Sequence, residues 1–92
     1  MSMSNVNSAK VYRDIDQFID RLFHLVEGFP RDKKVILGDR ILNHCLDTAT
    51  YIHLAYTFTD NKKTNIEQAI FHFHEVISLL RHAHDWKIIS NK

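Results

Sequence analysis

The chain has 92 residues, of which 45% are hydrophobic and 25% charged, and its formal net charge is +1. This length makes one domain over residues 1–92, and the balance of apolar and charged residues, with two glycines and one proline, excludes a disordered chain. A nearly neutral charge argues against a general polyanion binder unless the basic residues gather on one face.

The first residues, 1–7, lack both the basic start and the apolar stretch of a secretory signal, so we expect a disordered tail. Nowhere does the sequence hold the run of about 18 apolar residues that a membrane-spanning helix needs. The single cysteine, Cys45, excludes an internal disulfide and fits a reducing compartment. We therefore expect a cytoplasmic protein that has no membrane partner.

Two amphipathic helices are expected first, because apolar residues recur at steps of three and four. The first spans about 8–27, with Ser8 as its N-cap, and the second spans about 31–58. The apolar residues of the first are Val11, Ile15, Phe18, Ile19, Leu22, Phe23 and Val26. Those of the second form one stripe, Leu37, Ile41, Cys45, Ala49, Ile52 and Tyr56, which Ile36, Leu42 and Leu46 broaden.

A polar break separates the second helix from a third, expected over about 65–84, where Thr64 and Glu67 match a capping box. Phe71 and Leu79 fall outside its main apolar face, which indicates apolar surface that this chain alone does not cover. Residues 85–92 are expected to form a turn and a tail. The main face consists of Ile66, Ala69, Ile70, Phe73, Val76, Ile77 and Leu80.

The stretch that runs from the junction between the first two helices into the start of the second contains both glycines and the only proline. Gly28 suits the left-handed conformation that ends a helix, and Pro30 fits at or just before the next helix's first turn. Gly38 lies inside the second helical pattern, where glycine costs roughly 1 kcal/mol relative to alanine. Either another backbone packs closely against Gly38 or the cost is simply tolerated, and we expect close packing.

The same junction carries a motif: Phe29-Pro30-Arg31, a basic residue shortly after, then Leu37-Gly38-x-Arg40-Ile41. The motif resembles the four-helix-bundle family of the accessory variability determinant of diversity-generating retroelements (Avd-like). Proteins encoded within intervening sequences of bacterial large-subunit ribosomal RNA genes belong to the same family. The likeness runs from about Val11 to Ser90. Its structural residues are Gly28, Phe29, Pro30, Leu37, Gly38 and Ile41.

The resemblance implies an all-α, antiparallel up-down helical bundle whose first three helices lie in this chain. The family's fourth helix would begin near Ser90, whereas the sequence ends at Lys92. That helix is therefore expected to be missing or truncated, and its groove to be filled by another subunit. By the same resemblance the assembly is a pentamer, with a dimer as the alternative, and its partners are a reverse transcriptase and RNA or DNA.

Catalytic and metal chemistry are not expected. Within a helix His72 and His74 point about 200° apart, as do His82 and His84, so neither pair can bind one metal ion. Cys45 follows His44 directly, and adjacent helical residues diverge, while the sequence has no glycine-rich phosphate loop. We expect no enzyme, no cofactor and no metal. The seven histidines are expected at the surface or half-buried: His24, His44, His53, His72, His74, His82 and His84.

Positive charge is concentrated in two segments. Residues 31–40 hold four basic residues against two acidic ones, and residues 81–92 hold three against one. In an up-down-up arrangement both segments meet at one pole, and Lys62 and Lys63 lie at the other. The candidates for contact with nucleic acid or a partner are Arg31, Lys33, Lys34 and Arg40, followed by Arg81 and Lys87.

Two alternatives stay open for these residues. The basic segments can be an ordinary solvated rim, and Arg40 can instead pair with Glu27 across the helix junction. Most of Phe18, Phe23, Phe71 and Phe73 fit helical core periods, whereas Trp86 and Tyr12 are the candidate exceptions for base stacking.

The expected function is that of a non-enzymatic oligomeric adaptor. It would bind a reverse transcriptase, nucleic acid or both through its basic surface, as the resemblance implies for mutagenic copying. The alternative is a structural helical module that associates with itself through an uncovered apolar groove and has no nucleic-acid role.

Overall fold

The computed structural model describes the backbone of residues 4–89 and the side chains of residues 10–89. Within this range the chain is helical and has no strand, which confirms the all-α class with three long helical segments. α1 spans Ser4–Glu27, α2 Arg31–Lys33, η1 Lys34–Gly38, α3 Asp39–Thr57 and α4 Lys62–Asp85. Because α2, η1 and α3 follow one another without a break, together they form the second helix expected from the sequence.

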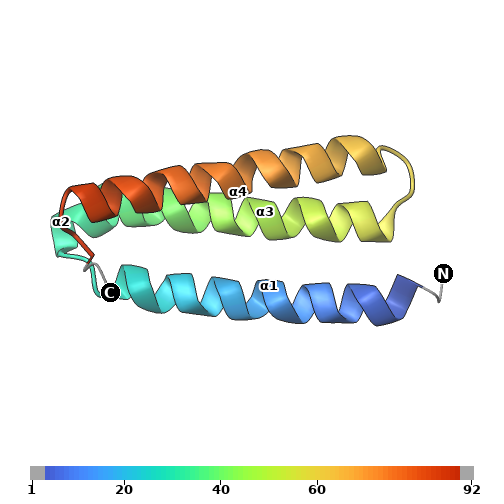
Figure 1. Ribbon diagram of the computed structural model, residues 1–92, viewed down its shortest axis with the longest axis horizontal. Helices are drawn as coiled ribbons and strands as arrows, with labels where there is room; N and C mark the ends of the chain where they lie inside the picture. The colour runs from blue at the N-terminus through green and yellow to red at the C-terminus, as the bar shows by residue number, and fades with distance from the viewer. Residues whose placement is uncertain (1–3, 90–92) are drawn as a thin grey trace.

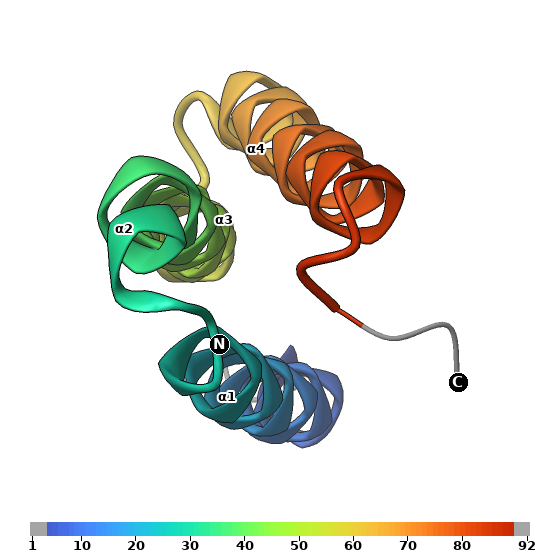
Figure 2. The same cartoon turned by 90° about the vertical axis from the view of Figure 1, so that its left-hand side faces the viewer.

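The three long segments lie along the long axis of a molecule measuring 45 × 22 × 20 Å (Figure 1). The chain runs along this axis in α1, back in α3 and forward again in α4. Figure 2, an end-on view, shows α3 placed between α1 and α4. The end of α1, all of α2 and the end of α4 lie at one end of the molecule, and the α3–α4 loop lies at the other.

The helix starts differ from the sequence expectations. α1 begins at Ser4, so Ser8 lies inside the helix and residues 4–7 are not a tail. α4 begins at Lys62, after Asn61 in the left-handed conformation (φ 64°), which asparagine tolerates better than most residues. The capping box at Thr64 and Glu67 was therefore wrong, since both residues already lie within α4.

The turn after α1 also differs from the sequence expectation. Gly28 does not adopt a left-handed conformation; instead the amides of Gly28 and Phe29 donate to the carbonyl oxygens of Leu25 and Val26, at 3.1 and 2.9 Å. Phe29 is then buried, and this anchors the turn. Pro30 directly precedes α2 with φ −56° and ψ 150°, which confirms its predicted place.

A single π-helical turn, η1, joins α2 to α3. The Asp39 amide donates to the Lys34 carbonyl five residues back, so this turn holds one residue more than an α-turn. Leu37 thereby faces the core, whereas Val35 and Ile36 are 65% and 63% exposed. The exposed apolar pair has no counterpart in the sequence analysis, where Ile36 was assigned to the buried stripe.

Gly38 is buried where η1 meets α1, and a Cβ atom there would lie 2.6 Å from Cγ1 of Val26. The expected close packing is confirmed, although the neighbour is a side chain and not a backbone.

The main core occupies the end of the molecule that holds α2. It draws on all three long helices and on the Phe29 turn, and the described segment after α4 packs against it through Ile88 and Ile89. Leu79, which the helical period had placed outside the main face, is 8% exposed and belongs to this core. Its buried residues are Leu22, Val26, Phe29, Leu37, Ile41, Cys45, Val76, Leu79 and Ala83.

A Schellman turn ends α4. The Lys87 amide donates to the His84 carbonyl and the Ile88 amide to the Ala83 carbonyl, at 2.9 and 2.8 Å. Lys87 adopts the left-handed conformation (φ 60°), which glycine usually occupies at this position of the turn. This turn directs Ile88 and Ile89 back onto the core. The expected turn after residue 84 is thus present, and Ser90, where a fourth helix was expected to begin, lies outside the described residues.

Candidate functional site

An apolar groove of about 330 Å³ lies between α1 and α4, with its floor on α3. It lies beyond the main core, toward the α3–α4 loop. The rings of Phe18 and Phe73 meet across it, with centroids 5.7 Å apart. Its lining residues are Asp14, Ile15 and Phe18 of α1, Cys45, Thr48 and Ile52 of α3, and Ile66, Ala69, Ile70 and Phe73 of α4.

The groove leaves large apolar side chains partly open to solvent. Ile66, Ile70 and Phe73 are 39%, 52% and 39% exposed, although the sequence placed all three on the main apolar face of this helix. Thr48 offers no free hydroxyl donor, since its Oγ1 donates to the His44 carbonyl at 2.9 Å. The surface therefore suits an apolar partner and not a polar small molecule.

Cys45 forms part of the groove floor and is 1% exposed. Desolvation by burial raises the pKa of its thiol from 9.0 to about 11. The thiol therefore stays protonated at neutral pH and is a poor nucleophile. This agrees with the place of Cys45 in the apolar stripe that the sequence predicts for the second helix.

The six candidate cations all belong to the segments that meet at the core end of the molecule. Arg31, Arg40, Arg81 and Lys87 are exposed, whereas Lys33 and Lys34 are half-buried. Lys33 has its Nζ 3.7 Å from an oxygen of Asp32. Among the described residues the other five have no acidic partner. The two basic sequence segments thus lie together at the core end of the molecule, which we call the basic end. Five of their six candidate cations are available to bind an anion from outside the chain.

The alternative role of Arg40 is not supported. Glu27 lies with its Oε1 3.8 Å from Nδ1 of His24, and within the part of the chain that the structure describes Arg40 has no ion pair. Arg40 is exposed on the first turn of α3.

The two aromatic candidates for base stacking differ in how exposed their rings are. Tyr12 is half-buried against His53 and Tyr56, with ring centroids 5.8 and 6.2 Å away. Trp86 is 58% exposed at the basic end, where it stacks on His82 with ring centroids 5.5 Å apart. Only Trp86 therefore offers an accessible ring.

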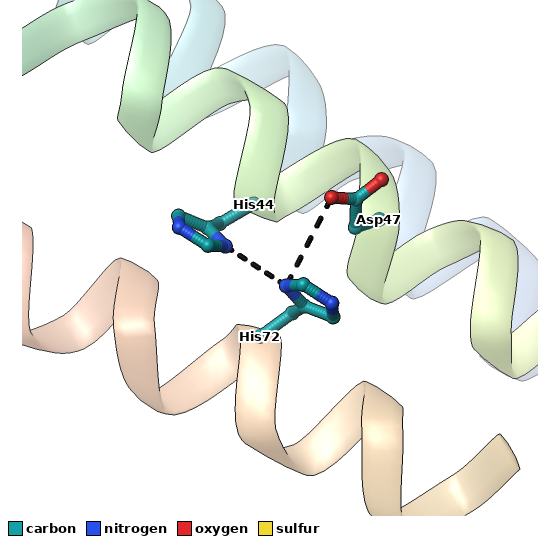
Figure 3. Close-up of side chains that lie close together, drawn as sticks. All are labelled: His44, Asp47 and His72. Carbon is teal, nitrogen blue, oxygen red and sulfur yellow. Dashed lines mark hydrogen bonds and ion pairs between the residues drawn. The ribbon is translucent and has the colours of Figure 1, made fainter.

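A third cluster lies on the seam between α3 and α4 and joins His44, Asp47 and His72 (Figure 3). Nδ1 of His44 is 2.8 Å from Nδ1 of His72, which in turn is 3.9 Å from Oδ2 of Asp47. The sequence analysis missed this group because it compared histidines within one helix. The spacing of His44 and Asp47, three residues apart, was the available signal; the contribution of His72 needed the packing of α4 on α3.

None of the helices in the described range is both long enough and apolar enough to cross a bilayer. Comparison of the chain with protein-family models, with curated proteins and with solved structures finds no match.

Proposed function

We propose that this chain is a non-enzymatic helical adaptor that associates with itself through the apolar groove and binds nucleic acid through its basic end. The observation that carries the proposal is the pairing of two unsatisfied surfaces on one small fold. One surface is apolar and open along α1 and α4, and the other holds five cations without acidic partners among the residues that the structure describes.

The groove supports self-association because it lies where a fourth helix would complete a bundle. Its walls belong to α1 and α4, which are separated by α3 in the end-on view (Figure 2). A helix from a second copy would cover Ile66, Ile70 and Phe73, whose exposure is costly in a monomer. The assembled unit is therefore an up-down bundle completed between subunits; by the family resemblance it is a pentamer, with a dimer as the alternative.

The basic end supports contact with phosphates. Five cations from the α2–η1 region and the end of α4 lack acidic partners within the described residues, and Trp86 exposes a ring beside them. The net charge per chain is only +1, so a single copy attracts a polyanion weakly. Repetition of the basic end around an oligomer multiplies the local charge that one nucleic acid meets.

The natural partner that we propose is the one that the motif resemblance implies. In the Avd-like reading the basic end faces a reverse transcriptase and its template RNA, and Arg31, Lys33 or Lys34, and Arg40 are the cations that coincide with the family motif. Val35 and Ile36 lie on the same short stretch and add an apolar contact for a protein partner. The protein would act in the cytoplasm, where both partners occur.

The second candidate is the structural module without a nucleic-acid role. The observation that favours it is the groove itself, which is sufficient to drive association without help from charge.

The test measures binding of a labelled single-stranded RNA by fluorescence anisotropy at about 50 and 200 mM salt. Binding should weaken steeply with salt, and the double variant Arg31→Ala with Lys34→Ala should lower the slope of log K against log[salt] by about 1 to 2. The matched control is Lys62→Ala with Lys63→Ala, which removes the same charge from the opposite end of the molecule. Equal effects of the two double variants, or no RNA binding at low salt, would reject nucleic-acid binding through the basic end. The structural module without a nucleic-acid role would then be the remaining proposal.

A further inference from the structure

We propose that His44, Asp47 and His72 bind a divalent transition-metal ion of the zinc class. The site is independent of the proposed function, since it lies on the α3–α4 seam, whereas the groove has α1 as one wall and the basic end lies beyond the core. Among the residues that the structure describes, this is the one group of three histidine, cysteine or acidic residues whose ligand atoms lie within 4.8 Å of one another.

The two helices supply the donors in complementary ways. His44 and Asp47 are three residues apart on α3, so their side chains lie on one face of that helix, and His72 reaches the same point from α4 (Figure 3). An ion held by all three would therefore connect α3 to α4. Two imidazole nitrogens and one carboxylate oxygen suit Zn²⁺, Co²⁺ or Ni²⁺ and do not suit Mg²⁺ or Ca²⁺.

The distances fit a tetrahedral ion after small adjustments. With metal–ligand bonds of about 2.0 to 2.1 Å, neighbouring donor atoms of a tetrahedral zinc site lie about 3.3 Å apart. The His44–His72 distance of 2.8 Å is shorter than this value and the His72–Asp47 distance of 3.9 Å is longer. Side-chain movements of about half an ångström bring both distances to the zinc geometry, and the ligand atoms of His44 and Asp47, the third pair, lie within 4.8 Å of each other.

The surroundings hold the imidazole of His72 in place. Its ring stacks on Tyr51 with centroids 5.6 Å apart and an interplanar angle of 8°, and it forms a T-shaped pair with Phe71, with centroids 5.1 Å apart. The side chain of His72 is 14% exposed, whereas that of Asp47 is 53% exposed. The site thus has a dry side toward the helix seam and a wet side toward solvent. Water completes the coordination on the wet side.

The short contact between the two histidines has a chemical consequence. Two neutral imidazoles at 2.8 Å can share only one proton between their Nδ1 atoms, because a hydrogen bond needs one donor and one acceptor. A divalent ion accepts the lone pairs of both nitrogens at once and adds the attraction of the Asp47 carboxylate. Metal binding would therefore replace one imidazole–imidazole hydrogen bond and one 3.9 Å ion pair with three metal–ligand bonds.

The experiment titrates the full chain with ZnCl₂ by calorimetry and with CoCl₂ by visible absorption, with MgCl₂ as the unreactive ion. One Zn²⁺ should bind per chain, Co²⁺ should give the intense absorption bands of a four-coordinate site, and Zn²⁺ should raise the thermal unfolding midpoint. His72→Gln and His44→Gln should each weaken binding at least ~10-fold, since a ligand matters at least as much as the groups that orient it. Asp47→Asn should weaken it similarly.

The matched control is His74→Gln, because His74 is exposed on the same helix two residues after His72 and takes no part in the cluster. It should bind zinc as the unchanged chain does. Circular dichroism before metal addition separates loss of binding from loss of folding, and the two histidine variants, on different helices, serve as checks on each other. No binding at 100-fold excess of Zn²⁺, binding that survives His72→Gln, or one ion per two chains with dimer formation would each overturn the proposal.

Discussion

Gly38 and Val26 lie so close that a methyl group on Gly38 would meet Cγ1 of Val26 at 2.6 Å. Val26 is 2% exposed and has few ways to move, since a β-branched side chain is restricted about its first torsion. Gly38 has ordinary helical torsions, φ −61° and ψ −43°, so its role is to leave space and not to allow an unusual backbone. Through this contact α1 and the π-helical turn reach the spacing on which the core depends.

Gly38→Ala should destabilise the protein by about 1 to 2 kcal/mol. Overpacking costs about 1 to 3 kcal/mol, and the higher helix propensity of alanine offsets up to about 1 kcal/mol of this. Urea unfolding followed by circular dichroism measures the difference. Gly28→Ala is the matched control, because a Cβ there would lie 3.5 Å from the Leu25 carbonyl oxygen, an ordinary contact. A Gly38→Ala variant as stable as the unchanged chain would contradict the close packing.

The same contact predicts non-additivity. In the double variant Gly38→Ala with Val26→Ala, the new methyl group occupies space that the shorter side chain vacates. The destabilisations of the two single variants, added together, should therefore exceed the destabilisation of the double variant by at least about 1 kcal/mol. Additive changes would mean that the structure relaxes around the alanine by another route.

Lys87→Gly should stabilise the chain by about 0.5 to 1 kcal/mol. Lys87 holds the left-handed position of the Schellman turn, where a side chain costs about 1 kcal/mol and glycine does not. Lys87→Ala removes the same charge but keeps the Cβ atom, so it should give no gain. Thermal unfolding of the three chains side by side checks this, and equal midpoints for the two variants would contradict it.

The Cys45 thiol should react about 100-fold more slowly with a thiolate-selective reagent at pH 8 in the folded chain than in urea. A rise in pKa from 9.0 to about 11 lowers the thiolate fraction by that factor. Leu46→Cys in a Cys45→Ala chain is the control, because position 46 is 51% exposed and should react at the rate of an open thiol. Similar rates at both positions would mean that the groove floor opens readily.

The pH dependence of stability follows from the same pKa. Folding favours the neutral thiol, so the contribution of Cys45 is fully present below pH 9.0 and is lost as the pH rises through about 11. The free energy of unfolding of the unchanged chain should fall more steeply over this interval than that of Cys45→Ala. Parallel curves for the two chains would contradict the raised pKa.

Self-association should depend on Ile70 and not on its neighbour Phe71. The two residues are 52% and 53% exposed, yet only Ile70 lines the groove. Ile70→Glu places a charge in the apolar interface and should shift the solution mass toward the monomer, whereas Phe71→Glu should leave it unchanged. Light scattering coupled to size exclusion measures both masses. A monomeric unchanged chain, or equal effects of the two variants, would contradict association through the groove.

Local pattern was enough to predict the helical parts of this molecule. The apolar period located three helices, and the end of the first and the start of the second agree with the structure at Glu27 and Arg31. The period failed at Leu79, which is buried, and at Phe23, Ile36 and Leu46, which are exposed. The errors at Leu79 and Ile36 arise where rotation of a helix about its own axis matters: α4 turns Leu79 toward the core, and the extra residue of η1 turns Ile36 away from it.

The sequence by itself determined that the chain is helical and which segments carry positive charge, because these properties depend on neighbours within about one helical turn. It also predicted close packing at Gly38, but the neighbour, Val26 of α1, was known only from the tertiary structure. Tertiary structure alone decided that Ile66, Ile70 and Phe73 face an open groove and that His44 meets His72, 28 residues away. The physical reason is that an amphipathic period fixes which side chains share a face, while the face of the neighbouring helix that they meet is chosen by packing the whole core.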